Sequence, residues 1–292
     1  MRPKLLGYPP DGGRSSAAAE TGLAAASPVS PAIAVRGLAK VYQTNAGDTV
    51  HAVAHMDFDV DAKEFVSIVG PSGCGKTTVL RILAGLVGGY SGSVSIGGRV
   101  VHGPTPEIGV VFQDANLMPW RTVLANVMLP GEVLRLNRNE CRERALALLK
   151  LVGLEGFENK LPRELSGGMR QRAAIARALV HNPKILLMDE PFGALDAMTR
   201  DTMNLELARI AVGSGKTVFL ITHSISEAVF LSDRVLVMSS RPGRIIETIQ
   251  VRNQRPRGLD VIATPRFSEM VLHIRHLLEG EGAPASTVTL AH

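Results

Sequence analysis

The feature that most constrains this chain is a glycine-rich loop placed between an apolar run and a helical pattern. The apolar run spans residues 65 to 69, and the helical pattern runs from Thr78 to Leu86. The loop between them reads Gly70-Pro71-Ser72-Gly73-Cys74-Gly75-Lys76-Thr77. This order of strand, G-x-x-x-x-G-K-[ST] loop and helix is typical of a loop that cradles phosphate groups. The alternative is a simple turn with a solvated lysine, and the flanking strand and helix argue against it.

The residues of this loop have distinct expected tasks. Glycines at 70, 73 and 75 let successive backbone N–H groups point at phosphate oxygens, and the helix N-terminus adds a partial positive charge. Lys76 is expected to reach the β- and γ-phosphates, and the Thr77 hydroxyl to bind Mg²⁺. We therefore predict nucleotide contacts from Gly70, Pro71, Ser72, Gly73, Cys74, Gly75, Lys76, Thr77 and Thr78. We also expect the Cys74 thiol to ionise readily, because Lys76 and a helix N-terminus favour thiolate.

A second G-K-T triplet, Gly215-Lys216-Thr217, serves as a control for this interpretation. The pattern would require a glycine at position 210, which is Ile, and the triplet leads into a strand instead of a helix. We expect no phosphate site there.

A pair of carboxylates follows the next strongly apolar run. Residues 185 to 188 read Ile-Leu-Leu-Met, and Asp189 and Glu190 come directly after them. In open α/β sheets ligands bind at the carboxyl ends of the strands, where this pair would emerge. We predict that Asp189 is an Mg²⁺ partner and that Glu190 polarises the attacking water. Such pairs are often only solubilising, an alternative that the nearby phosphate loop disfavours.

Two isolated polar residues are predicted to lie at the same edge. Gln113 follows the apolar run of residues 108 to 112, and His223 follows the run of residues 218 to 221. Each could be an ordinary loop residue, but their joint placement beside Asp189 and Glu190 favours contact with the γ-phosphate. We assign both to catalysis, and Gln113 also to the metal.

Another distinctive string opens a helix at Leu165-Ser166-Gly167-Gly168-Met169-Arg170-Gln171-Arg172. Ser166 is a plausible N-cap, and Gly167 and Gly168 leave the first N–H groups of the helix uncovered for an anion. One nucleotide cannot easily touch both this helix start and the Gly70 loop of one compact chain. We therefore expect this surface to contact the nucleotide of a second subunit, in a two-fold arrangement that closes two sites at once.

Composition removes several classes of protein. The chain has 292 residues, 45% hydrophobic and 20% charged, and only two cysteines, which excludes wholesale disorder and a disulfide scaffold and makes a reducing compartment the default. The net charge of +5 is spread thinly and aromatics make up 4%, which argues against a nucleic-acid partner. Apolar runs are of strand length, so we expect no membrane span.

The remaining pattern predicts an α/β fold. Residues 1–31 are rich in Pro, Gly, Ser and Ala and are expected to be disordered, as is a tail at 281–292.

Residues 33 to 103 suggest an antiparallel layer with a Gly97-Gly98 turn, and Glu140 to Val152 suggests an amphipathic helix. From Leu165 onward helices alternate with apolar strands, which is typical of a parallel sheet. A last amphipathic helix is expected from Thr264 as N-cap to Gly280 as stop, within a region 256–280.

Taken together, these motifs resemble those of ABC transporter ATPase subunits. The resemblance spans about residues 33 to 250 and is carried, in order, by Gly70–Thr77, Gln113, Leu165–Arg172, Ile185–Glu190, Asp196 and His223. The strings at 117–123 and 240–245 look most like the ATPases of nitrate, sulfonate and taurine importers. The resemblance implies a P-loop domain at 32–255 with an antiparallel β-subdomain and a helical subdomain at about 114–164.

The resemblance also implies cofactors and partners. ATP and Mg²⁺ would be held between two copies of the chain, with Lys76 of one copy facing Ser166 and Gly168 of the other. Tyr42 would stack on adenine, although a simple strand aromatic is equally plausible. Asp196 would contact the nucleotide across the dimer. Ser224 and Gly193 depart from the usual residues, without removing a group that touches phosphate.

Transport would require a membrane partner. The helical subdomain is expected to receive a helix of a transmembrane permease subunit, with Trp120 as a candidate lining residue and a core role as the alternative. The resemblance implies a peripheral subunit on the cytoplasmic face of the bacterial inner membrane, served indirectly by a solute-binding protein. A soluble ABC-type ATPase not coupled to transport is the alternative, but residues 113 to 166 leave no room for a long coiled coil. The solute itself is not encoded in this chain.

Overall fold

The computed structural model describes residues 30–43, 47–193, 197–251 and 257–280. The expected disorder of residues 1–31 falls almost wholly outside these ranges, and the tail at 281–292 and Asp196 lie outside them as well. No helix in the described ranges is long and apolar enough to cross a membrane.

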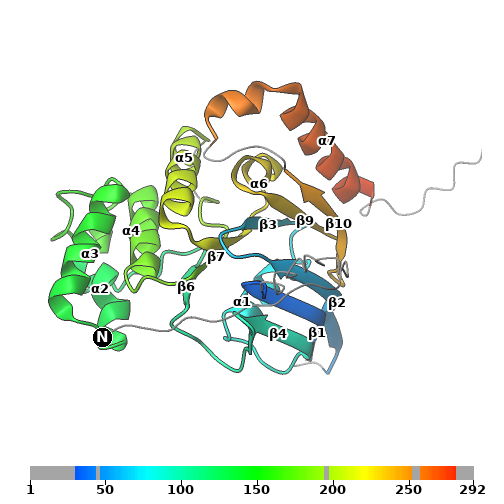
Figure 1. Cartoon of the computed structure of the whole chain (residues 1–292), viewed down its shortest axis with the longest axis horizontal. Helices are drawn as coiled ribbons and strands as arrows, with labels where there is room; N and C mark the ends of the chain where they lie inside the picture. The colour runs from blue at the N-terminus through cyan, green and yellow to red at the C-terminus, as the bar shows by residue number, and fades with distance from the viewer. Residues whose placement is uncertain (1–29, 44–46, 194–196, 252–256, 281–292) are drawn as a thin grey trace, which may run out of the picture.

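Two sheets form the centre of the structure (Figure 1). The first is antiparallel and has the order β2-β1-β4-β5, with β1 at Ile33–Gln43, β2 at Thr49–Val60, β4 at Ser91–Ile96 and β5 at Arg99–Val100. The second has the order β10-β9-β3-β8-β7-β6. Its strands are β3 (Phe65–Val69), β6 (Ile108–Val111), β7 (Ile185–Asp189), β8 (Thr217–Ile221), β9 (Arg234–Met238) and β10 (Ile245–Gln250). All neighbours in it pair in parallel except β10 and β9.

Helices cover the second sheet and extend beyond it (Figure 1). They are α1 (Lys76–Leu83), α2 (Val123–Val133), α3 (Arg138–Leu151), α4 (Gly167–Leu179), α5 (Ala197–Ser214), α6 (Ile225–Leu231) and α7 (Pro265–Gly280), with short 3₁₀ turns at Pro162–Glu164 and Leu259–Ala263. The α/β class, the antiparallel layer and the helical part are confirmed. Helix α4 packs against α2 and α3, so it belongs with them in space.

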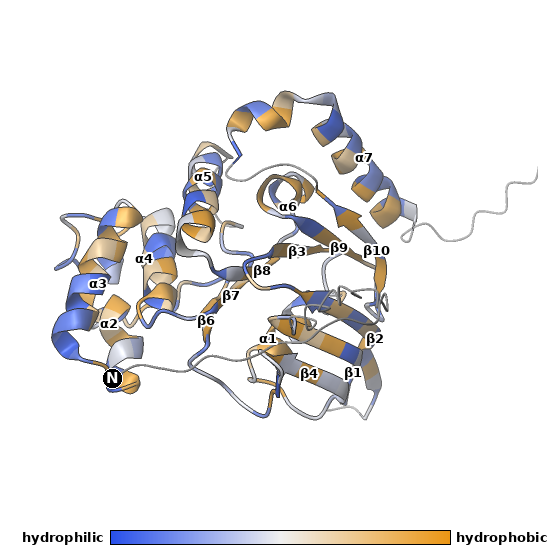
Figure 2. Cartoon of the chain, in the orientation of Figure 1, coloured by the Kyte–Doolittle hydropathy of each residue, from blue (hydrophilic) through white to orange (hydrophobic). Residues whose placement is uncertain are grey.

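The strands of the second sheet separate two hydrophobic cores. In β3, Phe65 and Val69 face a core shared with helices α2 to α7, whereas Val66 and Ile68 face a core shared with α1 and the antiparallel sheet. Both faces are therefore buried, which explains the near-continuous apolar runs of the central strands, orange in Figure 2.

Several local predictions can be compared with the structure. The turn at Gly97-Gly98 and the helix capped by Thr264 are present, and the Thr264 hydroxyl accepts a hydrogen bond from the Phe267 N–H at 3.3 Å. Helix α7 buries Phe267 and Ile274 within its own chain, against α6 and β9. In the 140–152 helix one apolar stripe of Leu146, Leu149 and Val152 is expected; Leu149 and Val152 are buried, whereas Leu146 is only half-buried.

Helix α2 was not assigned from the sequence, and it forms although Pro130 lies inside it. Its N-terminus is capped by Thr122, which accepts from the Ala125 N–H at 3.2 Å. The buried Asn126 side chain accepts from the Met118 N–H at 2.7 Å and donates to the carbonyls of Met118 and Arg121 at 3.1 and 3.0 Å. These bonds fix the loop that carries Trp120.

A close contact between β6 and α4 generates a prediction about stability. A Cβ on Gly109 would lie 2.3 Å from the backbone oxygen of Ala178, so Gly109→Ala must push strand and helix apart. We expect the free energy of unfolding to fall by about 1–3 kcal/mol, measured by urea denaturation. Gly103→Ala is the control, because a Cβ there meets no atom within 4 Å. Equal stabilities of the two variants would contradict the packing argument.

Candidate nucleotide site

A pocket of about 320 Å³ opens at the carboxyl ends of the parallel strands. Most of its lining residues were expected from the sequence, and the full set is Tyr42, Val50, Ala52, Ser72, Gly73, Gly75, Lys76, Thr77, Thr78, Glu190 and Arg241. A larger hollow of about 390 Å³ opens at the amino ends of β7 and β8, beside Lys184 and Thr217, and holds none of the predicted site residues.

The backbone of the phosphate loop requires glycine at two positions, because of its dihedral angles and its close contacts. Gly73 and Gly75 have φ values of +75° and +105°, which side-chain-bearing residues rarely adopt. A Cβ on Gly75 would also lie 2.6 Å from the Ala52 carbonyl oxygen. The Lys76 amine donates to the Gly70 and Pro71 carbonyls at 2.8 and 2.9 Å, which holds it at the mouth of the loop.

Thr77 and Asp189 meet as the sequence predicted. The Thr77 hydroxyl donates to Asp189 Oδ1 at 3.2 Å. Burial raises the pKa of the Asp189 carboxyl, the neighbouring Glu190 charge adds to this, and the Thr77 hydrogen bond opposes it. Hydroxyl and carboxylate oxygens are the ligands that Mg²⁺ prefers, so Thr77 and Asp189 fit a magnesium site completed by phosphate and water. Within the described ranges no group of three or more His, Cys, Asp or Glu side chains could hold a metal alone.

Glu190 brings the two isolated polar residues together. Its Oε2 accepts a hydrogen bond from Gln113 Nε2 at 3.4 Å and lies 3.2 Å from His223 Nδ1. Since a carboxylate only accepts, Nδ1 of His223 is the donor. The Glu190 backbone has φ +46° and its N–H is tied to the Ile221 carbonyl at 2.8 Å.

Helix α4 supports the loop that carries Gln113. Buried Gln171 donates to the Phe112 carbonyl at 3.0 Å, one residue before Gln113. Arg177 donates to the carbonyls of Ala115 and Asn116 at 2.6 and 2.7 Å. The helix that begins with the Ser166 string is thus connected to the Gln113 loop.

The Ser166 string itself lies apart from the pocket. The Ser166 hydroxyl accepts from the Met169 N–H at 3.3 Å, as an N-cap should, and Gly167 begins α4. Ser166 and Gly167 are exposed and Gly168 is half-buried, and none of the three lines the pocket of Lys76. Tyr42 does line it, with Lys40 Nζ 4.9 Å from the centre of its ring.

Comparison with known proteins places these motifs in a family. A family model described as ABC transporter matches residues 53–193. An uncharacterized ABC transporter ATP-binding protein of Methanocaldococcus jannaschii is 49% identical over 240 residues, covering 82% of this chain and 90% of the relative. The chain belongs to the ABC transporter ATP-binding family.

Other relatives agree with this assignment. The taurine import ATP-binding protein TauB of Rhizobium johnstonii is 48% identical over 237 residues, covering 80% of this chain and 90% of TauB. TauB of Escherichia coli is 45% identical over 204 residues, covering 70% and 80%. The dimeric ATP-binding cassette MJ0796, solved with ADP and Pi, has a TM-score of 0.67 at 34% identity and covers 76% of this chain and all (100%) of that chain. As a member of this family, the chain is an ABC-type ATPase.

One expectation for the ABC ATPase is wrong, that of a reactive Cys74. Its side chain is 1% exposed, and burial raises the pKa of the thiol more than the Lys76 charge lowers it. The lysine and helix N-terminus favour thiolate only where water can solvate it, so the buried thiol stays protonated. Cys74 shapes the loop without lining the pocket.

The wall residues Val50 and Ala52 of the ABC ATPase pocket were not predicted, and neither were two residues with polar contacts, Arg241 and Glu227. Arg241 lines the pocket and donates to the Gly73 carbonyl; its place in the 240–245 string was the available signal. Glu227, three residues after Ser224 in the pattern of a capping box, is buried beneath the His223 loop and hydrogen-bonded to the Thr222 hydroxyl. That hydroxyl accepts from the Ser224 N–H at 3.0 Å, and the Ser224 hydroxyl accepts from the Glu227 N–H at 3.3 Å.

Burial of Glu227 generates a prediction about pH. Burial raises the pKa of its carboxyl above the ordinary 4.5, so the folded parent loses stability as the pH rises through that raised pKa. Glu227→Gln has no such charge to bury. Relative to the parent, Glu227→Gln should therefore be more stable at pH 8 than at pH 5, with the free energy of unfolding measured by urea denaturation.

Glu164→Gln is the matched control for this pH effect. A hydrogen bond from the Leu161 N–H lowers the pKa of the Glu164 carboxyl below the ordinary 4.5. Glu164 therefore stabilises the fold throughout the range from pH 5 to 8, and this contribution is lost only as the pH falls through the lowered pKa. The difference between this variant and the parent should stay constant from pH 5 to 8. A constant difference for Glu227→Gln as well would contradict the assignment.

Proposed function

We propose that this ABC ATPase hydrolyses MgATP as one of two paired subunits that energise a membrane importer of a small oxyanion such as taurine, another sulfonate or nitrate. The observation that carries the catalytic part is the convergence of Gln113 and His223 on Glu190 Oε2 at the edge of the Lys76 pocket. The importer and its solute class rest on the similarity to the TauB subunits at 48% and 45% identity.

Each residue of the pocket has a task in this proposal. Lys76 and the N–H groups from Gly73 to Thr78 bind the phosphates, and Tyr42 stacks on adenine. Thr77 and Asp189 would hold Mg²⁺, with Gln113 as a further contact; the ion would offset the negative charge of the β- and γ-phosphates. Glu190 orients the attacking water and takes its proton, while Gln113 and His223 keep the carboxylate aimed at the γ-phosphate.

A second copy of the chain completes the site. Ser166 and Gly167 are exposed at the start of α4, Gly168 is half-buried, and none of the three lines the pocket of its own chain, which favours a contact to a partner's nucleotide. Asp196 would add a contact across the same interface. The link from α4 to the Gln113 loop would let one subunit respond to nucleotide held with the other.

We further propose that the subunit sits peripherally on the cytoplasmic face of the bacterial inner membrane, against transmembrane permease subunits and served by a solute-binding protein. Trp120 supports this, since its side chain is 75% exposed on a loop fixed by Asn126. An exposed indole on a rigid loop is a typical anchor for a partner. We also propose that the chain divides into an ATPase domain at 32–255, with a helical part at about 114–164, and a helix region at 256–280, with extensions at 1–31 and 281–292.

The catalytic assignment predicts the behaviour of Glu190→Gln. The amide cannot accept the proton of water, so steady-state phosphate release should fall at least about 100-fold while MgATP binding is retained. Glu155→Gln, at an exposed ion pair with Lys150, should hydrolyse ATP like the parent. An active Glu190→Gln variant would overturn the role of Glu190.

The permease assignment predicts the behaviour of Trp120→Ala. The free subunit should keep near-normal ATPase activity, whereas co-purification with its permease subunits should fall at least about tenfold, because an exposed aromatic anchor is lost. Val133→Ala is the control, since Val133 is 72% exposed on the same helical part. Normal assembly of Trp120→Ala would refute this docking surface.

A further inference from the structure

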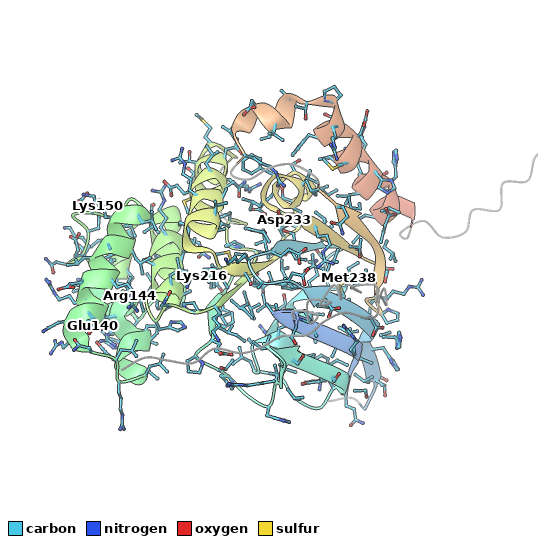
Figure 3. The ribbon with its side chains drawn as sticks, viewed as in Figure 1. Glu140, Arg144, Lys150, Lys216, Asp233 and Met238 are labelled. Atoms are coloured by element: carbon cyan, nitrogen blue, oxygen red, sulfur yellow. The ribbon has the colours of Figure 1, made fainter. Side chains whose placement is uncertain are left out.

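The turn between β9 and β10 is built against the phosphate loop, although it lies about 170 residues further along the chain. Gly243 is the point of closest approach, since a Cβ there would lie 2.1 Å from the Cys74 carbonyl oxygen and 1.9 Å from Met238 Cε. Met238, labelled in Figure 3, ends β9 beside the antiparallel sheet. Only a glycine lets the turn lie this close to the loop.

The same turn is tied to the wall of the pocket that carries Ala52. The Gly243 N–H donates to the Ala52 carbonyl at 3.1 Å, and the Gly243 carbonyl accepts from the Ala54 N–H at 2.9 Å. The buried Ser239 hydroxyl accepts from the Arg244 N–H at 3.1 Å, and its single proton faces the Ser240 and Pro242 carbonyls at 2.9 and 3.2 Å. The turn is therefore held from both sides, and the backbone position of Arg241 is fixed.

From this turn Arg241 reaches over the phosphate loop. Its Nε and Nη2 donate to the Gly73 carbonyl at 3.1 and 2.8 Å, and its side chain lines the pocket with Lys76 and Thr77. A guanidinium has five N–H donors in a planar fork, and the Gly73 carbonyl uses only part of them. Arg241 thus lines a pocket that also offers Lys76 and backbone N–H groups to an anion, and it has N–H donors beyond those used by Gly73.

We propose that Arg241 is a binding residue for the polyphosphate of the nucleotide, held in place by the Gly73 carbonyl. Its charge adds to that of Lys76, and its fork matches phosphate oxygens in a way that a lysine amine cannot. This inference rests on the proposed nucleotide site and is independent of the importer assignment.

The test measures affinity for MgADP and for adenosine by competition against a fluorescent ADP analogue. Arg241→Ala should weaken MgADP binding about tenfold and leave adenosine binding unchanged, because the contact is to phosphate. Arg241→Lys keeps the charge without the fork and should lose about threefold. Arg244→Ala removes an equal charge from the same turn outside the pocket and should stay within about twofold of the parent.

Several outcomes would overturn the proposal. Unchanged MgADP affinity in Arg241→Ala would do so, and so would an equal loss for adenosine, which would indicate damage to the turn. Thermal unfolding without ligand checks each variant for folding. The Lys76→Ala variant distinguishes failure of the Arg241 proposal from failure of the proposed nucleotide site. If Lys76→Ala also binds MgADP normally, the pocket does not hold the nucleotide at all.

Discussion

The nucleotide pocket depends on a loop with two glycines that leave no room for a side chain. A Cβ on Gly70 would lie 2.9 Å from the Met238 carbonyl oxygen, and one on Gly75 would lie 2.6 Å from that of Ala52. The loop thus lies between the end of β9 and strand β2 of the antiparallel sheet, and these contacts leave room only for glycine at both positions. Because its shape is set by neighbours on both sides, the N–H groups are arranged for phosphate without the cost of ordering a flexible loop.

The two adjacent carboxylates differ because their surroundings differ. Asp189 is the last residue of a buried strand, and burial raises the pKa of its carboxyl above the ordinary value, a cost that a bound cation would offset. Glu190 leaves the strand in a left-handed conformation that costs about 1–3 kcal/mol, and it meets two hydrogen-bond donors at the rim. One carboxylate therefore suits a metal, and the other suits a water molecule. The bond from the Glu190 N–H to the Ile221 carbonyl shows how the strained position is held.

Local sequence patterns predicted the parts of the site that depend on residues close in the chain. The phosphate loop, the strand before Asp189 and the Ser166 cap all follow from spacing within a few residues. Errors arose where burial decides the chemistry. Cys74 has the neighbours of a reactive thiol but is shielded from water, and Glu227, which was not singled out from the sequence, is buried beneath the His223 loop. Helix α2 was not assigned from the sequence; the Thr122 cap and the hydrogen bonds of Asn126 stabilise it although Pro130 lies inside it.

By itself, the sequence determined the class of fold, the phosphate loop and the identity of the residues at the strand ends, because hydrophobic period and glycine spacing are local properties. Only the tertiary structure decided which of those residues meet. Gln113 and His223, which follow two different strands, meet at one carboxylate oxygen of Glu190, which follows a third. Ser166 lies outside the pocket of its own chain, and Arg241 contacts the Gly73 carbonyl. Such contacts join residues distant in the chain, and the order of strands in a sheet and the closeness of packed backbones are not encoded in any one segment.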